Sequence, residues 1–184
     1  MKKKSMALVL ALAMIVVCVV GGTLAWLTAK TPDVKNTFTT SDVSITLEET
    51  TKNYKMVPGY TISKDPKVTV VAGSEKCYLF VKVEESTNFN DFMTYEIADG
   101  WTSLGGDNVY YRIVDTPDMG TAYSVLKDDQ VTVKDTVTKA EMSDLNAEGA
   151  TQPTLTFTAY ACQFMKNNTE NFTPAEAWHS VPKT

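Results

Sequence analysis

The sequence predicts an all-β fold, an antiparallel jelly-roll-like sandwich with one or two short helices, preceded by a cleavable signal helix. Three observations lead to this fold class. Apolar and polar residues alternate with a period of two through most of the chain after residue 40, which is typical of strands with one buried face. The alternating runs are short. Turn-forming residues separate them, as in antiparallel sandwiches.

The N-terminal segment, residues 1–25, has the layout of a secretory signal peptide. Three lysines at positions 2–4 precede an apolar run from Met6 to Val20, and small residues follow it. As a helix, the apolar run would span about 22 Å, which is short of the roughly 30 Å of bilayer hydrocarbon. We therefore expect contact with the membrane only through this precursor segment.

The end of the apolar run predicts a cleavage site between Ala25 and Trp26. Thr23 and Ala25 place small residues at the third and first positions before the cut, as signal peptidases require. Cleavage would leave residues 26–184 as one secreted domain. The alternative is an uncleaved anchor, because no charged residue occurs between Ser5 and Ala29.

The charge balance restricts the partners of the domain. The chain has 22 acidic and 17 basic residues and a formal net charge of −5. Cleavage would remove three lysines and no acidic residue, so the mature domain is more acidic still. An acidic surface disfavours binding to nucleic acid and adhesion to anionic lipid.

The strands are predicted from runs in which every second residue is apolar. These runs are residues 43–47, 68–70, 77–83, 109–113, 131–133 and 155–161. Turn signals lie between them, and the sequence Gly-Gly-Asp-Asn at positions 105–108 predicts a hairpin loop between WTSL and VYYRIV.

Two short helices carry their own start signals. Thr138 and Glu141 form one predicted capping box, and Thr173 and Glu176 form a second with proline at the first helical position. We expect these helices to cover an open end or edge of the sheets, with Trp178 packing inward.

Two cysteines remain after cleavage, Cys77 and Cys162, and they permit one disulfide in an oxidising compartment. Cys77 alternates in phase with Leu79 and should face inward. Cys162 lies out of phase with the apolar residues of its run, so a bridge would require a bulge or a covered outer face. The alternative is two separate thiols.

The search for catalytic motifs is negative. The only histidine is His179, and one Glu176–His179 pair falls short of the three protein ligands of a catalytic zinc site. We therefore predict no catalytic residues, no cofactor and no metal site. Five aspartates near predicted strand ends could bind calcium, although loop solvation is the simpler explanation; they are Asp115, Asp118, Asp128, Asp129 and Asp135.

The junction between signal and domain reads GGTLAWLTAKTPDVKNTFTTSDVSITL, from Gly21 to Leu47. A Gly-Gly-Thr-x-Ala box, a following aromatic residue and an Asn-Thr-Phe segment that opens the fold resemble the start of the TasA and camelysin group of exported proteins of Gram-positive bacteria. Ser41 stands near where that group often has glycine. Weaker similarities extend over most of the chain, such as the strand that begins at Cys77.

The resemblance implies a secreted structural subunit of extracellular biofilm matrix fibres, cut by a SipW-type signal peptidase. In such fibres the freed N-terminal segment of one subunit completes a sheet of its neighbour, and other matrix proteins are possible partners. The donor strand here would be residues 26–38, with Trp26, Leu27, Val34 and Phe38 as its apolar residues. The alternative for this segment is an intramolecular first strand or a loose tail.

Two other functions stay open from the sequence. Camelysin carries a metalloprotease label, which would make the chain a cell-surface protease, although the sequence supplies no ligand set for it. The chain could also be a monomeric cell-surface module that binds peptide or glycan through aromatic residues such as Tyr110 and Tyr111.

Overall fold

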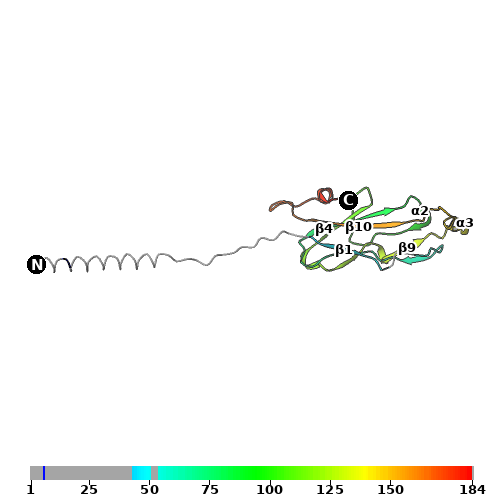
Figure 1. Cartoon of the computed structure of the whole chain (residues 1–184), viewed down its shortest axis with the longest axis horizontal. Helices are drawn as coiled ribbons and strands as arrows, with labels where there is room; N and C mark the ends of the chain where they lie inside the picture. The colour runs from blue at the N-terminus through cyan, green and yellow to red at the C-terminus, as the bar shows by residue number, and fades with distance from the viewer. Residues whose placement is uncertain (1–5, 7–42, 51–53, 184) are drawn as a thin grey trace. The chain divides into compact units, whose positions relative to one another are not determined.

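The computed structural model describes Met6, residues 43–50 and residues 54–183. The chain divides into two units, Met1–Thr39 and Thr40–Thr184, and all the strands belong to the second (Figure 1). In chain order the elements are β1 Ile45–Glu48, β2 Thr61–Ser63, β3 Lys67–Val70, β4 Cys77–Glu85, α2 Phe89–Phe92, β5 Met93–Thr94, β6 Thr102–Ser103, β7 Val109–Val114, the 3-10 turn η1 Thr116–Asp118, β8 Ala122–Ser124, the 3-10 turn η2 Lys127–Asp129, β9 Gln130–Val133, α3 Lys139–Asp144, β10 Leu155–Gln163 and α4 Pro174–Ser180.

The described strands form three sheets, and every pairing between them is antiparallel. One sheet has the order β1-β3-β8, the second β10-β4-β7-β6 and the third β2-β9-β5. The prediction of an all-β fold with antiparallel sheets is confirmed. Strand β4 is the centre of the second sheet, since β10 pairs with it on one side and β7 on the other (Figure 1).

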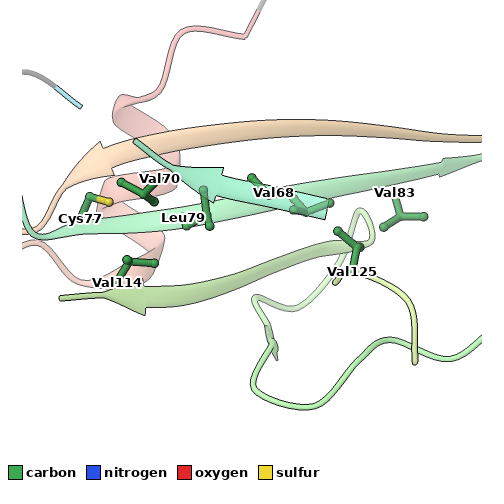
Figure 2. Packing of buried hydrophobic residues seen from close by; sticks show 8 residues of the cluster. Val68, Val70, Cys77, Leu79, Val83, Val114 and Val125 are labelled. Carbon is green, nitrogen blue, oxygen red and sulfur yellow. The ribbon is translucent and has the colours of Figure 1, made fainter. Parts of the chain in front are cut away.

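The two faces of β4 pack into two different core clusters. Its alternate residues Cys77, Leu79, Val81 and Val83 are at most 1% exposed and pack with the valines of β3 and β7 (Figure 2). This cluster joins the four-stranded sheet to the sheet of β1, β3 and β8. The prediction that Cys77 faces inward is confirmed.

The opposite face of β4 carries an aromatic cluster beneath α4. The ring of Trp178 lies 5.4 Å from that of Phe80 and 5.2 Å from that of Tyr160, centre to centre. The Tyr78 hydroxyl donates a hydrogen bond of 2.8 Å to the carbonyl of Phe172, just before the helix. Helix α4 therefore covers the outer face of the sheet, and the predicted inward packing of Trp178 is confirmed.

The third sheet has its own core beside α2. Phe89 of α2 and Met93 of β5 pack against Leu126 and against Val131 and Val133 of β9. Helix α2 was not predicted, because it is only four residues long and Asn88 before it makes no side-chain cap. The short strands β2, β5 and β8 were also missed.

The elements with strong local sequence signals, the two capping boxes and the hairpin loop, are present in the structure. Both predicted capping boxes are present, at Thr138–Glu141 and Thr173–Glu176. The predicted hairpin joins β6 to β7, with Asp107 and Asn108 in left-handed conformation. By contrast Leu47, expected on a buried face, is 37% exposed.

Candidate functional site

The residues predicted for signal cleavage and strand donation lie outside the described residues. They are Thr23, Ala25, Trp26, Leu27, Val34 and Phe38. A strand donated by another copy would have to pair with the edge of a sheet, and the sheets of this domain lie within the described residues.

The outer edge of β10 is the longest sheet edge in the described part of the chain. Strand β10 has nine residues and, among the strands that the structure describes, pairs with β4 alone. None of its residues is buried, whereas six of the nine residues of β4 are. A long edge strand of this kind presents a row of backbone donors and acceptors to a further strand.

The ladder between β10 and β4 fixes which backbone groups point outward. The amide of Phe164 donates to the carbonyl of Lys76, and the amide of Ser86 donates to the carbonyl of Thr154. Because hydrogen-bonded pairs alternate in an antiparallel ladder, the even-numbered residues of β10 bond to β4. The outward groups therefore belong to Leu155, Phe157, Ala159, Ala161 and Gln163.

The apolar members of this outward set also face the inner core. Leu155, Phe157, Ala159 and Ala161 pack against the cluster that contains Val68 and Val81, yet each is only partly buried. A further strand along this edge would thus satisfy backbone groups and cover apolar side chains at once.

Strand β1 supplies a second edge beside β10. The two strands are in contact, and β1 is the edge of the other sheet that encloses the core. The amide of Val71 donates to the carbonyl of Ser44, so the alternation directs the backbone groups of Ile45 and Leu47 away from β3. No hydrogen bond joins the outward groups of either strand to another residue of the described ranges. We call this pair of edges, Ile45–Glu48 and Leu155–Gln163, the β1/β10 side.

The opposite side of the same two sheets is closed by stacked side chains. The guanidinium of Arg112 on β7 lies between the rings of Trp101 and of Tyr123 on β8, with its central carbon 5.3 Å and 3.7 Å from their centres. The Trp101 indole donates a hydrogen bond of 2.8 Å to the carbonyl of Ser124. Burial lowers the pKa of Arg112 from its usual value, although the group stays a cation. Such a stack covers the inner face where β6 and β8 end their sheets.

The disulfide that Cys77 and Cys162 would permit is not formed, and both cysteines are free thiols. Cys77 pairs with Gln163 and Cys162 with Tyr78, so the two sulfur atoms lie on neighbouring strands but face opposite sides of the sheet. Burial, and secondarily the neighbouring thiol of Cys162, raises the pKa of Cys77 to about 11. The alternative of two separate thiols therefore describes the structure.

Glu176 and His179 do not form part of a larger ligand group. The Glu176 carboxylate accepts hydrogen bonds from the amide and hydroxyl of Thr173 and from Lys166, and these bonds lower its pKa to about 2. Within the described ranges, no three His, Cys, Asp or Glu side chains come close enough to hold a metal ion. Glu176 thus serves as the cap of α4.

Two of the aspartates considered for calcium binding form ion pairs, and both tyrosines considered for peptide or glycan binding pack against the core. Asp115 forms an ion pair of 2.7 Å with Lys76, and Asp129 one of 3.5 Å with Lys67. Tyr110 packs against the inner core and Tyr111 against the aromatic cluster, where its ring lies 6.1 Å from that of Tyr78. Neither tyrosine forms an open aromatic platform for a ligand.

One polar cluster was not predicted from the sequence. Lys64 is 9% exposed and forms an ion pair of 2.6 Å with Glu49, to which the Tyr54 hydroxyl also donates at 2.8 Å. The Lys64 ammonium lies 5.1 Å from the ring centre of Tyr54 and 5.3 Å from that of Phe157. No short sequence spacing signals this cluster, because β2 separates the lysine from the glutamate.

Comparison of the chain with protein-family models, curated proteins and solved structures finds no match. A separate search of the described residues finds no helix both long and apolar enough to cross a membrane.

Proposed function

We propose that this protein is a secreted structural subunit that assembles into extracellular matrix fibres. In this proposal, cleavage between Ala25 and Trp26 frees residues 26–38, and this segment adds a strand to the β1/β10 side of the next copy. The observation that supports it best is that side itself, where two adjacent edge strands offer backbone groups and half-exposed apolar side chains together.

The donor segment has the length that this edge requires. Residues 26–38 would reach about 43 Å when fully extended, whereas the nine residues of β10 span about 30 Å. The segment can therefore cover the whole of β10 and leave a few residues for the crossing between subunits.

The composition of the segment suits strand addition with one restriction. Val34 and Phe38 are four residues apart and share one face of a strand, and Trp26 and Leu27 add apolar area at the other end. Pro32 lacks an amide hydrogen, so it must lie where the donor makes no bond to β10, or at a bulge.

Cleavage would act as the switch for assembly. Before the cut, the apolar run Met6–Val20 holds the donor segment at the membrane, where it cannot reach the edge of another subunit. A SipW-type signal peptidase would then restrict polymerisation to the outside of the cell. The resemblance to TasA and camelysin motivates this step and the place of the fibres in a biofilm matrix, with other matrix proteins as possible partners.

We also propose that the fold is a jelly-roll-like sandwich. Two antiparallel sheets share the core of β3, β4 and β7, which is the arrangement of a sandwich. The third sheet and helices α2, α3 and α4 would then be additions to that sandwich.

The proposal is tested on the protein that cells export. Mass spectrometry should give an N-terminus at Trp26, and negative-stain microscopy should show filaments whose number grows with protein concentration. A variant without residues 26–37 should be exported, fold with the same melting temperature and stay monomeric. A wild-type protein that remains a single particle at high concentration would end the proposal.

The same experiment separates the alternatives. A monomeric module that binds peptide or glycan would form no filaments with or without the donor segment. A camelysin-like protease would cleave casein in a zinc-dependent manner and lose this activity on substitution of Glu176 or His179. We expect no such activity, because Glu176 is held in the cap of α4.

A further inference from the structure

A cavity of about 800 Å³ lies between residues 54–56, helices α2 and α3, strands β5 and β9, and the first residue of β10. Its buried walls are Lys64, Phe89, Met93, Val131 and Leu145, and its exposed rim includes Lys55, Asn146, Gln152 and Thr154. A cavity of this size that combines apolar walls with a few polar groups is the usual form of a small-molecule site. Nothing in the proposed fibre function uses this cavity.

The chemistry of the walls points to a flexible aliphatic ligand. Three methionines line the cavity, Met56, Met93 and Met142, and their unbranched side chains adapt to the shape of what they contact. The other apolar walls are aliphatic except for Phe89 and Tyr54. A rigid or planar ligand would need a flatter and more aromatic site than this one.

The charges of the walls point to a single anionic group. None of the described residues that line the cavity is acidic, whereas two of them are lysines, in a chain with a net charge of −5. The Lys64 ammonium is already neutralised by Glu49 at 2.6 Å. Lys55 on the rim therefore leaves the site with one net positive charge, which matches one carboxylate.

We propose that this cavity binds an aliphatic monocarboxylate, with its hydrocarbon chain between Met93, Val131 and Leu145 and its carboxylate at Lys55. A phosphate head group would need more donors than the rim provides, because the side-chain amides of Asn146 and Gln152 already donate to the carbonyls of Met142 and Leu145, which leaves Lys55. The proposal does not use the donor segment, and the cavity shares only Leu155 with the β1/β10 side.

The methionine methyl groups provide a direct test. In protein labelled with carbon-13 at these methyls, octanoate should shift the signals of Met56, Met93 and Met142 in a saturable manner. Met119 and Met165 lie outside the cavity and are internal controls. Octylammonium, which has the same chain and the opposite charge, should bind at least tenfold more weakly.

Three variants complete the test. Lys55→Gln should weaken octanoate binding about fivefold, and Lys76→Gln, which removes an equal charge elsewhere, should leave it unchanged. Met142→Trp should fill the cavity and abolish the shifts of Met56 and Met93. Lys55 and Met142 are not among the buried residues, so the variants at these two positions should keep the wild-type melting temperature. Lys76 forms an exposed ion pair with Asp115, so Lys76→Gln should lower the melting temperature only slightly.

Either of two results would overturn the proposal. One is the absence of any shift at the cavity methionines up to the solubility limit of octanoate. The other is equal binding of octylammonium and octanoate, because the site would then have no preference for a carboxylate. Fibre formation can be scored on the same preparations, so failure here and failure of the proposed assembly are separate outcomes.

Discussion

The guanidinium carbon of Arg112 lies 3.7 Å from the centre of the Tyr123 ring, and this contact joins two different sheets. Arg112 belongs to β7 of the four-stranded sheet, whereas Tyr123 belongs to β8 of the three-stranded sheet. The stack covers the core where both sheets end. On the β1/β10 side, by contrast, the apolar residues of β10 are only partly buried. This asymmetry is the structural reason for placing strand addition on one side only.

Replacement of Arg112 tests the closed side. Arg112→Ala should lower the free energy of unfolding by about 2 kcal/mol, because it removes both the contact with Tyr123 and the packing of the arginine stem. Arg112→Met keeps most of the stem and should cost less than about 1 kcal/mol. Urea denaturation measures both values, and equal stability of wild type and the alanine variant would contradict the role of the stack. Neither variant should alter fibre formation.

A pair of proline substitutions tests the acceptor edge. The amide of Ala159 points away from β4, so Ala159→Pro should block strand addition while the ladder to β4 stays intact. The amide of Tyr160 bonds to β4, so Tyr160→Pro should remove a ladder hydrogen bond and lower the melting temperature of the domain. We expect the Ala159→Pro protein to melt near the wild-type temperature and to form no filaments in negative stain. Normal filaments from this variant would exclude β10 as the acceptor.

The sequence predicted which face each residue of a strand would occupy better than it predicted how deeply that face is buried. The alternation of apolar residues placed both faces of β4 correctly, and it also placed Leu155 and Phe157 toward the core. The alternation could not show that β10 lies at the edge of its sheet and β4 in the interior, because the apolar residues of both strands recur with the same period of two. Edge position follows from pairing between strands far apart in the chain.

The Lys64–Glu49 cluster and the cavity could not be predicted from the sequence for a related reason. Lys64 and Glu49 are brought together by the pairing of β1 with β3, and neither residue belongs to a motif. The cavity brings together residues from 54 to 155 in the chain. By contrast, a capping box is contained within four residues, which is why both were correctly predicted.

The capping box of α4 predicts a pH dependence of stability. The pKa of Glu176 is lowered from about 4.5 to about 2 by its bonds to Thr173 and Lys166. Because the folded state has the lower pKa, the stabilisation by Glu176 is complete above pH 4.5 and is lost as the pH falls from there towards 2. Glu176→Ala should therefore be less stable than wild type at pH 7, and the difference should shrink as the pH falls from 4.5 towards 2. Thermal melts across this range measure it, and a difference independent of pH would contradict the assignment.

The two cysteines should react with a thiol reagent at different rates. Cys77 is fully buried and has a pKa raised to about 11, so almost none of it is thiolate at pH 8, whereas Cys162 is partly exposed beside the hydroxyl of Ser180. Under native conditions we expect Ellman's reagent to react with Cys162 at least tenfold faster than with Cys77. Cys162→Ser should remove the faster reaction and leave the slower one.

Unfolding in guanidinium without a reductant provides the control for this labelling. Both thiols should then react at one rate, because the burial that separates them is lost. The exported protein should release two equivalents per chain, and a chain that keeps residues 1–25 should release three, since Cys18 is retained. No reaction of Cys77 and Cys162 in the unfolded, unreduced protein would mean that a disulfide joins them, which requires one of the two strands to turn its cysteine to the other face.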